Sequence, residues 1–228
     1  MRQLAVWAGF AVAYEAARGL ANRGPALALT NAGSVLRLER RLGGAFELHL
    51  QQSLLPVGAL ITVVNWTYWL AQFVVVGAAV AWIYLRRYPA YPFVRDTLIV
   101  TNTVGLIGYV LAPLAPPRLL PGYGFTDTLA RSASVNHGAG LVQLFENPYA
   151  AMPSLHTADA LIVGVALAVL VRPLWLKVVC LLWPAWVAFS LMVTGNHYWV
   201  DIAAGVLLVA VTTPATVALE RIVRRSRR

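Results

Sequence analysis

Residues 174–219 read LWLKVVCLLWPAWVAFSLMVTGNHYWVDIAAGVLLVAVTTPATVAL. Two apolar runs, 174–194 and 198–219, are separated only by a short polar turn around Gly195 and Asn196. Each run has about the 20 residues that an α-helix needs to cross the hydrocarbon core of a bilayer. The stretch therefore predicts two consecutive helices that cross a membrane in opposite directions.

Four further apolar runs precede this pair, at 3–20, 57–85, 96–115 and 154–171. Of the 228 residues, 59% are hydrophobic and 12% are charged, whereas a soluble domain is about 45–50% apolar and about 25% charged. This composition excludes a water-soluble enzyme, a disordered chain and a secreted disulfide scaffold. We predict an all-α fold, a polytopic membrane bundle of about six transmembrane helices that forms a single membrane-embedded domain over residues 1–228.

Residues 31–55 have a different pattern, NAGSVLRLERRLGGAFELHLQQSLL, in which apolar residues recur at helical spacing with charged residues between them. This pattern predicts an amphipathic helix that lies along the membrane interface; a solvated helix packed on the bundle is an equal alternative. We divide the chain into an N-terminal helix and amphipathic segment (1–56), a catalytic helical core (57–219) and a basic tail (220–228). Residues 3–20 either span the membrane or lie at its interface, and they also resemble a signal peptide.

Basic residues lie where the apolar runs end. The formal net charge is +9, but the basic residues form no single face, so nucleic acid is not a predicted partner. Ten of them lie in the segments 86–95 and 172–177 and in the tail: Arg86, Arg87, Arg95, Arg172, Lys177, Arg221, Arg224, Arg225, Arg227 and Arg228. These segments share one side if the runs alternate across the membrane, and the positive-inside rule assigns that side to the cytoplasm. Arginine replaces lysine almost everywhere, which is typical of a GC-rich genome, so we expect a bacterial cell membrane.

Three polar clusters fall at the opposite, extracytoplasmic ends of the runs. They are APPRLLP at 115–121, MPSLH at 152–156 and TGNHYWVD at 194–201. His197 and Asp201 are four residues apart and therefore share one face of a helix, where the carboxylate can orient the imidazole. His156 follows a helix-start signal, whose free backbone N–H groups favour an anion such as phosphate. Arg118, between prolines, offers a planar fork for phosphate oxygens, so the set suits phosphoryl transfer through a phosphohistidine.

The order Pro-Arg, Pro-Ser-x-His and His-x-x-x-Asp resembles the type 2 phosphatidic acid phosphatase superfamily, which shares its core with vanadium haloperoxidases. The motif sequences APPRLLP, PSLHTADA and TGNHYWVD are most similar to those of its inositol phosphorylceramide synthase branch. The resemblance covers roughly 115–205, and the upstream Glu39, Glu47 and Gln51 are consistent with that branch.

This resemblance implies a role for each matching residue. His197 corresponds to the nucleophile, Asp201 to its partner and His156 to the acid that protonates the leaving group. Arg118 and Ser154 correspond to residues that bind the substrate phosphate. The family chemistry needs no metal and no cofactor, although two imidazoles and a carboxylate would also suit zinc or iron.

Two departures from the family pattern separate this chain from a simple phosphatidate phosphatase. Classical members have a Ser-Arg pair upstream of the nucleophile, where this chain has Ser190 and Leu191, so one phosphate-binding arginine is missing. Pro-Ser-Gly-His has become Pro-Ser-Leu-His, which resembles the synthase branch. Asp159, inside a span, is a candidate for binding a polar acceptor or orienting His156.

Other residues near the clusters have less specific predictions. Tyr198 and Trp199 are predicted interface anchors, with Tyr198 as an alternative contact near the acceptor. The loop 121–150 is a candidate cap over the site, and its polar residues are Tyr123, Asp127, Arg131, Asn136, His137 and Glu146. His49 and His137 are predicted to be structural.

The predicted function is that of an integral membrane lipid phosphotransferase or phosphatase, inositol phosphorylceramide synthase-like, that acts on a lipid-linked phosphate or phosphodiester. Its predicted partners are a lipid phosphate or phospholipid substrate, a polyol or lipid alcohol acceptor, and membrane lipids. A plain lipid phosphate phosphatase, acting on a polyprenyl or glycerolipid phosphate, is the alternative. A transporter and an inactive scaffold of the same fold are less favoured.

We predict that the C-terminus faces the cytoplasm and that the candidate site faces away from it. The ten basic residues of the three segments outweigh Arg118 and Arg131 in the long outer loop. A reporter fused after residue 228, or cysteine labelling at that point, measures the side of the tail. An external C-terminus would reverse the side assigned to every candidate site residue.

Overall fold

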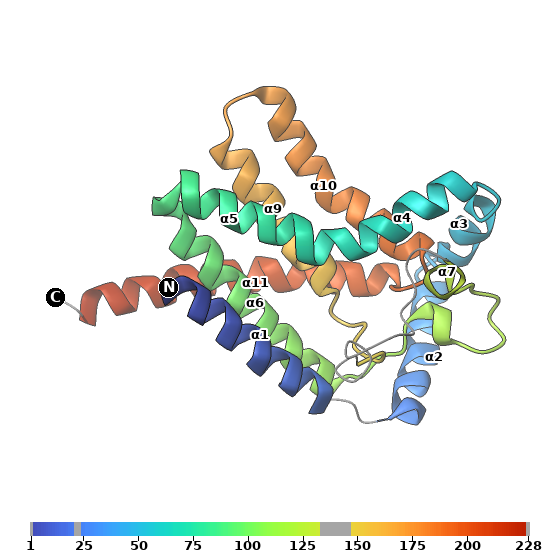
Figure 1. Cartoon of the computed structure of the whole chain (residues 1–228). Coiled ribbons are helices and arrows are strands. Elements are labelled where there is room, and N and C mark those ends of the chain that lie inside the picture. The colour runs from blue at the N-terminus through green and yellow to red at the C-terminus, as the bar shows by residue number, and fades with distance from the viewer. Residues whose placement is uncertain (1, 21–23, 133–146, 227–228) are drawn as a thin grey trace.

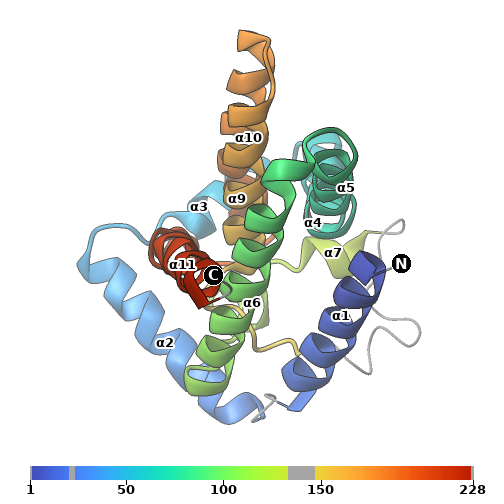
Figure 2. The same cartoon turned by 90° about the vertical axis from the view of Figure 1, so that its left-hand side faces the viewer.

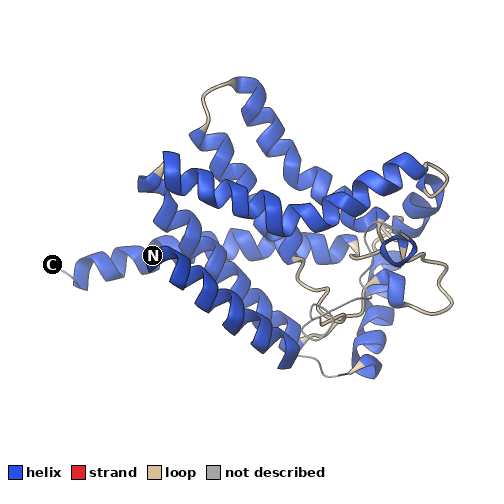
Figure 3. Ribbon diagram, in the orientation of Figure 1, coloured by secondary structure: helices blue, strands red, loops and turns tan. Residues whose placement is uncertain are grey.

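The computed structural model describes residues 2–20, 24–132 and 147–226. Within these ranges every regular element is a helix and no strand occurs (Figure 3). A single isolated β-bridge joins Leu114 to Ala150 among the described residues. The predicted all-α class is therefore confirmed.

Each of the six predicted apolar runs coincides with a helix, and α4, the π-helix η1 and α5 together form the second run. The elements are α1 (Arg2–Leu20), α2 (Pro25–Arg41), α3 (Glu47–Leu54), α4 (Gly58–Leu70), η1 (Ala71–Val75), α5 (Val76–Arg86), the 3₁₀ turn η2 (Tyr88–Ala90), α6 (Tyr91–Leu111), the 3₁₀ turn η3 (Pro117–Leu119), α7 (Thr128–Arg131), α9 (Leu155–Leu170), α10 (Leu174–Val193) and α11 (Trp199–Ser226).

Among the described residues, three helical runs are long and apolar enough to cross a membrane: Gly58–Arg86, Leu174–Val193 and Trp199–Ile222. Helix α9 is apolar but has 16 residues, about 24 Å at the α-helical rise, which is shorter than a hydrocarbon core of about 30 Å. Helix α6 begins before the predicted run and includes Arg95 and Asp96, while α1 carries Glu15 and Arg18 near its end. The structure thus supports three spans by length and composition.

Close backbone approaches place α9 at the centre of the bundle, where it packs against α10, α6 and α11. Gly205 on α11 lies so near the start of α9 that a Cβ there would come within 2.4 Å of the Ser154 carbonyl oxygen. Gly164 on α9 makes a similar approach to α10, with 2.6 Å from a Cβ to the Cys180 carbonyl oxygen. Gly205 thus brings the starts of α9 and α11, which carry two of the three polar clusters, into contact, and Gly164 packs α9 closely against α10.

The predicted amphipathic helix 31–55 is in fact two helices. A turn at 42–46 separates α2 from α3, and Gly43 adopts a left-handed φ of 71° there, which glycine accepts without strain. Gly44 lies under the Trp199 ring, with 2.8 Å from a Cβ to the indole nitrogen. The prediction of a single helix missed this break, because two consecutive glycines interrupt an otherwise continuous periodicity.

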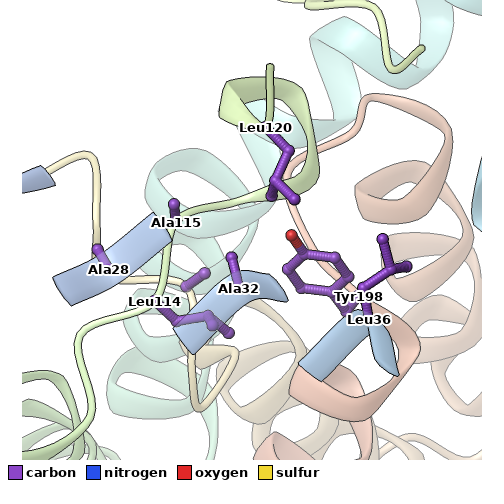
Figure 4. Close-up of a cluster of buried hydrophobic side chains, with 8 residues drawn as sticks. Ala28, Ala32, Leu36, Leu114, Ala115, Leu120 and Tyr198 are labelled. Atoms are coloured by element: carbon purple, nitrogen blue, oxygen red, sulfur yellow. The ribbon is translucent and has the colours of Figure 1, made fainter. Parts of the chain in front are cut away.

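Helix α2 contributes to a buried core rather than only to the membrane interface. Its Ala28, Ala32 and Leu36, spaced four residues apart, pack against Leu114, Ala115, Leu120 and Tyr198 (Figure 4). Of the two interpretations of 31–55, the structure favours a helix packed on the bundle. Its polar residues Glu39, Glu47 and Gln51 are buried as well.

The segments that connect the long helices lie at two opposite ends of the bundle. Helices α2, α3 and α7 gather at the right of Figure 1, whereas the α5–α6 connection and the C-terminus lie at the left. The turned view shows α1 beside the lower part of α6 (Figure 2), against which it packs.

Candidate active site

Three segments far apart in the sequence are joined by backbone hydrogen bonds at one end of the bundle. The bonds are Arg118 N–H to Gly195 O at 2.9 Å, Leu114 N–H to Tyr149 O at 2.8 Å, and Ser154 N–H to Asp201 O at 3.0 Å. Each pair joins two of the segments that hold the clusters 115–121, 152–156 and 194–201. The structure therefore brings the three predicted clusters together.

His197 lies in the turn between α10 and α11, and Asp201 lies in the first turn of α11. The Nδ1 of His197 is 3.3 Å from Oδ2 of Asp201, and the same oxygen accepts a hydrogen bond from the Tyr198 backbone N–H at 3.1 Å. A carboxylate that accepts a hydrogen bond from Nδ1 keeps the proton of the neutral ring on Nδ1 and leaves Nε2 with a free lone pair on the opposite side of the ring. This is the arrangement that the four-residue spacing predicts.

The His197 ring is buried, with 5% of the residue exposed. Burial lowers the pKa of His197 from 6.5 to about 3, a hydrogen bond with the Ala151 backbone opposes this shift, and the nearby positive charge of Arg118 adds to it. A lowered pKa keeps the imidazole neutral at physiological pH. A neutral ring has the free lone pair that a nucleophile or a base requires.

His156 lies in the first turn of α9 and faces His197. The two ring centroids are 6.1 Å apart, and the rings are inclined at 61°. Tyr68 of α4 stacks on the His156 imidazole at 4.7 Å between centroids, with 23° between the planes. The stacking fixes the orientation of His156, and the separation of the two histidines leaves room for a small group between them.

Both histidines line a cavity of about 770 Å³ enclosed by α1, the α4–α5 run, α6 and α9. Its polar lining gathers near His156, His197 and Arg118. Much of the remainder is apolar or aromatic, including Trp7, Phe10, Trp69, Phe73, Val76 and Leu98. A cavity that is polar at one end and apolar along its length suits a lipid with an ionic head group.

Arg118 is held rigidly by the 3₁₀ turn η3 and by two side-chain partners. Its Nε donates to Asn196 Oδ1 at 2.9 Å, and its Nη1 forms an ion pair with Asp127 Oδ2 at 2.8 Å. Asp127 was predicted only as part of a loop that caps the site, and Asn196 was not predicted as a site residue although it adjoins His197. Their bonds fix the guanidinium at the edge of the cavity.

Ser154 was predicted to bind phosphate and Tyr198 to lie at the membrane interface, but in the structure both side chains are buried against other parts of the protein. Ser154 is fully buried outside the cavity lining, and its Oγ accepts from the Thr157 N–H at 3.4 Å, which caps α9. Its phosphate-binding role stays a prediction. Tyr198 is 0% exposed and packs in the core with α2, so its interpretation as an interface anchor is wrong.

Asp159 lies one turn beyond His156 on α9 and lines the same cavity. Gln72 Nε2 donates to its Oδ2 at 2.6 Å, and Asn102 Nδ2 donates to its Oδ1 at 2.8 Å. Gln72 belongs to the π-helix η1, and such turns are frequent at functional sites. Neither Gln72 nor Asn102 could be assigned from the sequence, because each lies within an apolar run with no motif around it.

Two buried carboxylates hold the start of α11. Glu47 Oε1 accepts from the Trp199 N–H at 2.8 Å, and Glu39 Oε1 accepts from the Val200 N–H at 3.2 Å. Gln51 fixes the preceding turn, since its Nε2 donates to the carbonyls of Thr126 at 3.0 Å and Val193 at 2.9 Å. The helices α2 and α3 therefore position the backbone on which His197 and Asp201 stand.

In the described part of the predicted loop 121–150, Asn147, Pro148 and Ala150 line the cavity. Asp127 contacts Arg118, whereas Tyr123 lies under the Arg40 guanidinium at 5.8 Å and Arg131 is exposed. Asn136, His137 and Glu146 lie outside the described residues. Among the residues that the structure describes, no group of three or more His, Cys, Asp or Glu side chains is arranged to hold a metal ion.

Glu39 makes stability depend on pH in a defined direction. Burial, with the charge of Glu47 beside it, raises the pKa of Glu39 from 4.5 to about 8. The folded protein thus binds this proton more tightly than the unfolded chain, and the free energy of unfolding falls as the pH rises through this interval. We expect Glu39→Gln, which resembles the protonated acid, to reduce the loss of Tm between pH 6.5 and 8.

Thermal unfolding of purified protein in detergent measures this effect. The lowered pKa of His197 acts below pH 6.5 and with the opposite sign, so above pH 6.5 the difference in slope between wild type and Glu39→Gln measures the contribution of Glu39. Glu220→Gln, near the C-terminal end of α11, is the matched control and should keep the wild-type slope. Equal slopes for wild type and Glu39→Gln would contradict the assignment.

Residues 33–215 match the family described as the PAP2 superfamily. No curated protein and no solved structure matches the chain. The matched range runs from α2 into α11 and contains the three clusters, while α1 precedes it. The match confirms the resemblance at the level of the superfamily, and the inositol phosphorylceramide synthase branch stays a prediction. Because the match covers most of the chain and includes the joined clusters of His156, Arg118 and His197, the chain belongs to the PAP2 superfamily.

Proposed function

We propose that this protein is a membrane enzyme that transfers a phosphoryl or phosphorylated head group from a lipid through a phosphohistidine on His197. The observation that carries the proposal is the pair of imidazoles, 6.1 Å apart, at the polar end of a largely apolar cavity. Members of the PAP2 superfamily are phosphoesterases, which supports this class of chemistry.

The substrate class follows from the cavity lining. Trp7, Phe10, Phe73 and Val76 provide an apolar wall for an acyl or prenyl chain. At the other end, Arg118 provides a guanidinium for the phosphate oxygens. A lipid-linked phosphate or phosphodiester satisfies both parts, with its phosphorus between the two histidines.

In the first step, Nε2 of His197 attacks the phosphorus while Asp201 holds the ring through Nδ1. The bond from phosphorus to the leaving oxygen breaks, and His156, which takes up a proton when the anionic substrate binds beside it, donates that proton to the leaving oxygen. The products are a phosphohistidine, a neutral His156 and a released alcohol. Arg118 stabilises the negative charge on the phosphoryl oxygens.

In the second step, an acceptor hydroxyl attacks the phosphohistidine and gives its proton to His156. The bond from phosphorus to Nε2 breaks, which restores both histidines. Water as the acceptor gives hydrolysis, and an alcohol gives a new phosphoester. The chemistry at His197 is identical in both cases.

Asp159 favours an alcohol as the acceptor. Its carboxylate is buried, lines the cavity one turn beyond His156 and is oriented by Gln72 and Asn102. A carboxylate held in this way can accept hydrogen bonds from the hydroxyls of a polyol. Together with Pro-Ser-Leu-His and Leu191, it supports inositol phosphorylceramide synthase-like transfer, with a plain lipid phosphate phosphatase as the second candidate.

For the membrane, we propose that α1, α6 and α9 complete the bundle of about six transmembrane helices. If six helical runs cross the membrane in alternating directions, the α5–α6 connection, the α9–α10 connection and the C-terminal tail lie in the cytoplasm of a bacterial cell. The candidate site then lies on the outer side. The separation of α2, α3 and α7 from the α5–α6 connection and the C-terminus is consistent with this placement (Figure 1).

We expect His197→Ala to abolish turnover, because the variant lacks the nucleophile that Asp201 orients and that forms the covalent intermediate. Asp201→Asn should lower the rate about 10²- to 10⁴-fold, as when a carboxylate that fixes a tautomer is lost. His156→Ala should be least harmful toward a substrate whose leaving group needs no proton. Initial rates with an alkyl lipid phosphate and with an aryl phosphate measure these effects.

The control is His49→Ala, an exposed histidine outside the cavity lining, which should keep the wild-type rate. Near-normal activity of His197→Ala would exclude the phosphohistidine. Assays with and without a chelator test the metal-independent mechanism in the same preparation.

The acceptor is identified by supplying a lipid phosphate and a phosphoinositide separately, each with and without a polyol or lipid alcohol. We expect a new phosphodiester lipid that forms only when the alcohol is present. Asp159→Asn should reduce this product about tenfold or more, while it leaves formation of the phosphoenzyme intact, because a neutral amide binds hydroxyl donors less strongly. Inorganic phosphate released at a rate that no alcohol changes would establish the phosphatase instead.

A further inference from the structure

The two arginines that line the cavity within the described residues differ in their partners. Arg118 is bonded to Asp127 at 2.8 Å and to Asn196 at 2.9 Å. Arg18, on the last turn of α1, has a longer ion pair with Glu15 at 3.6 Å, and its buried Nε has no hydrogen-bond partner. A buried guanidinium N–H without an acceptor is unfavourable, and a ligand anion would satisfy it.

Helix α10 contributes no residue to the cavity lining. The resemblance implies a phosphate-binding arginine where this chain has Leu191, and Leu191 is 0% exposed among Ala71, Ala160 and Val187. A transferring phosphoryl group carries negative charge on several oxygens at once. The charge of Arg118 is already partly neutralised by Asp127, so the site as inferred from the family pattern is short of positive charge.

The backbone of Arg18 is fixed to the same segments that build the site. Its carbonyl oxygen accepts from Asn147 Nδ2 at 3.2 Å, and Asn147 Oδ1 accepts from the Tyr149 N–H at 3.0 Å. The Tyr149 carbonyl in turn accepts from Leu114, which precedes the Arg118 turn. The end of α1 is thereby anchored beside the chain that leads to His156.

The rest of α1 lines the apolar part of the cavity. Trp7, Phe10 and Tyr14 lie on it, about three, two and one turns before Arg18. One helix therefore presents an apolar stripe that ends in a cation, which matches a lipid chain that ends in a phosphate. Helix α1 also lies before the range that matches the superfamily, 33–215, so the family pattern does not assign it.

We propose that Arg18 is the second phosphate-binding guanidinium of the site and that α1 recognises the substrate lipid by its chain and its phosphate together. The proposal deepens the proposed function and rests on it, because the bound anion is the phosphate on which His197 acts. Glu15 holds the guanidinium in the empty cavity, and the phosphate oxygens replace the weak pair when a substrate binds.

The test measures phosphate binding apart from turnover. Inorganic phosphate is titrated calorimetrically into the purified full-length protein in detergent, for wild type and for Arg18→Gln, Arg18→Lys and Arg37→Gln. Arg37 is an exposed arginine on α2 outside the cavity lining and serves as the matched control. We expect Kd to rise about 10-fold or more in Arg18→Gln, less in Arg18→Lys, and to stay unchanged in Arg37→Gln.

Turnover of a lipid phosphate by the same preparations then separates the two proposals. We expect Arg18→Gln to raise KM for the lipid phosphate at least as much as it raises Kd for inorganic phosphate. A wild type that binds phosphate but turns over no lipid phosphate would contradict the proposed function and leave the Kd comparison to decide on Arg18. An active, folded Arg18→Gln protein with wild-type Kd and KM would overturn the role of Arg18 alone; if that variant does not fold, Arg18→Lys with a Kd and KM equal to wild type would do so.

Discussion

The buried start of α11 is the constraint on which the rest of the site depends. The first N–H groups of a helix have no partner within it, and Trp199 and Val200 of α11 are both half-buried. Glu47 and Glu39 accept from them at 2.8 and 3.2 Å. Without Glu47 and Glu39 these two N–H groups would lose the acceptors that tie the start of α11 to the rest of the protein, so the N-terminal helices α2 and α3 help to position His197 and Asp201.

The same constraint explains why the cavity can be apolar along most of its length. Its polar groups are concentrated at one end and bonded to one another: Arg118 to Asn196 and Asp127, and Asp159 to Gln72 and Asn102. Buried polar groups are tolerated when they are paired. The remaining walls are thereby free to be aromatic or aliphatic, as a lipid chain requires.

The motifs could be predicted because short-range rules determine them. The spacing of His197 and Asp201 places both on one helical face, and Pro153-Ser154 predicts the start of α9 before His156. Tyr198 shows the limit of such rules. An aromatic residue at the end of an apolar run is typical of an interface anchor, but here α2 covers the ring completely.

The sequence by itself determined the helical class, the apolar runs and the chemistry-bearing residues, because hydrophobic periodicity and motif spacing are local properties. Only the tertiary structure decided that Glu39 and Glu47 hold α11, that Gln72 and Asn102 orient Asp159, and that Arg18 lines the cavity with both histidines. Each of these pairings joins residues far apart in the chain. Their side chains carry no local pattern, and only the packing of α1, α2, α3 and α6 around α9 and α11 selects their partners.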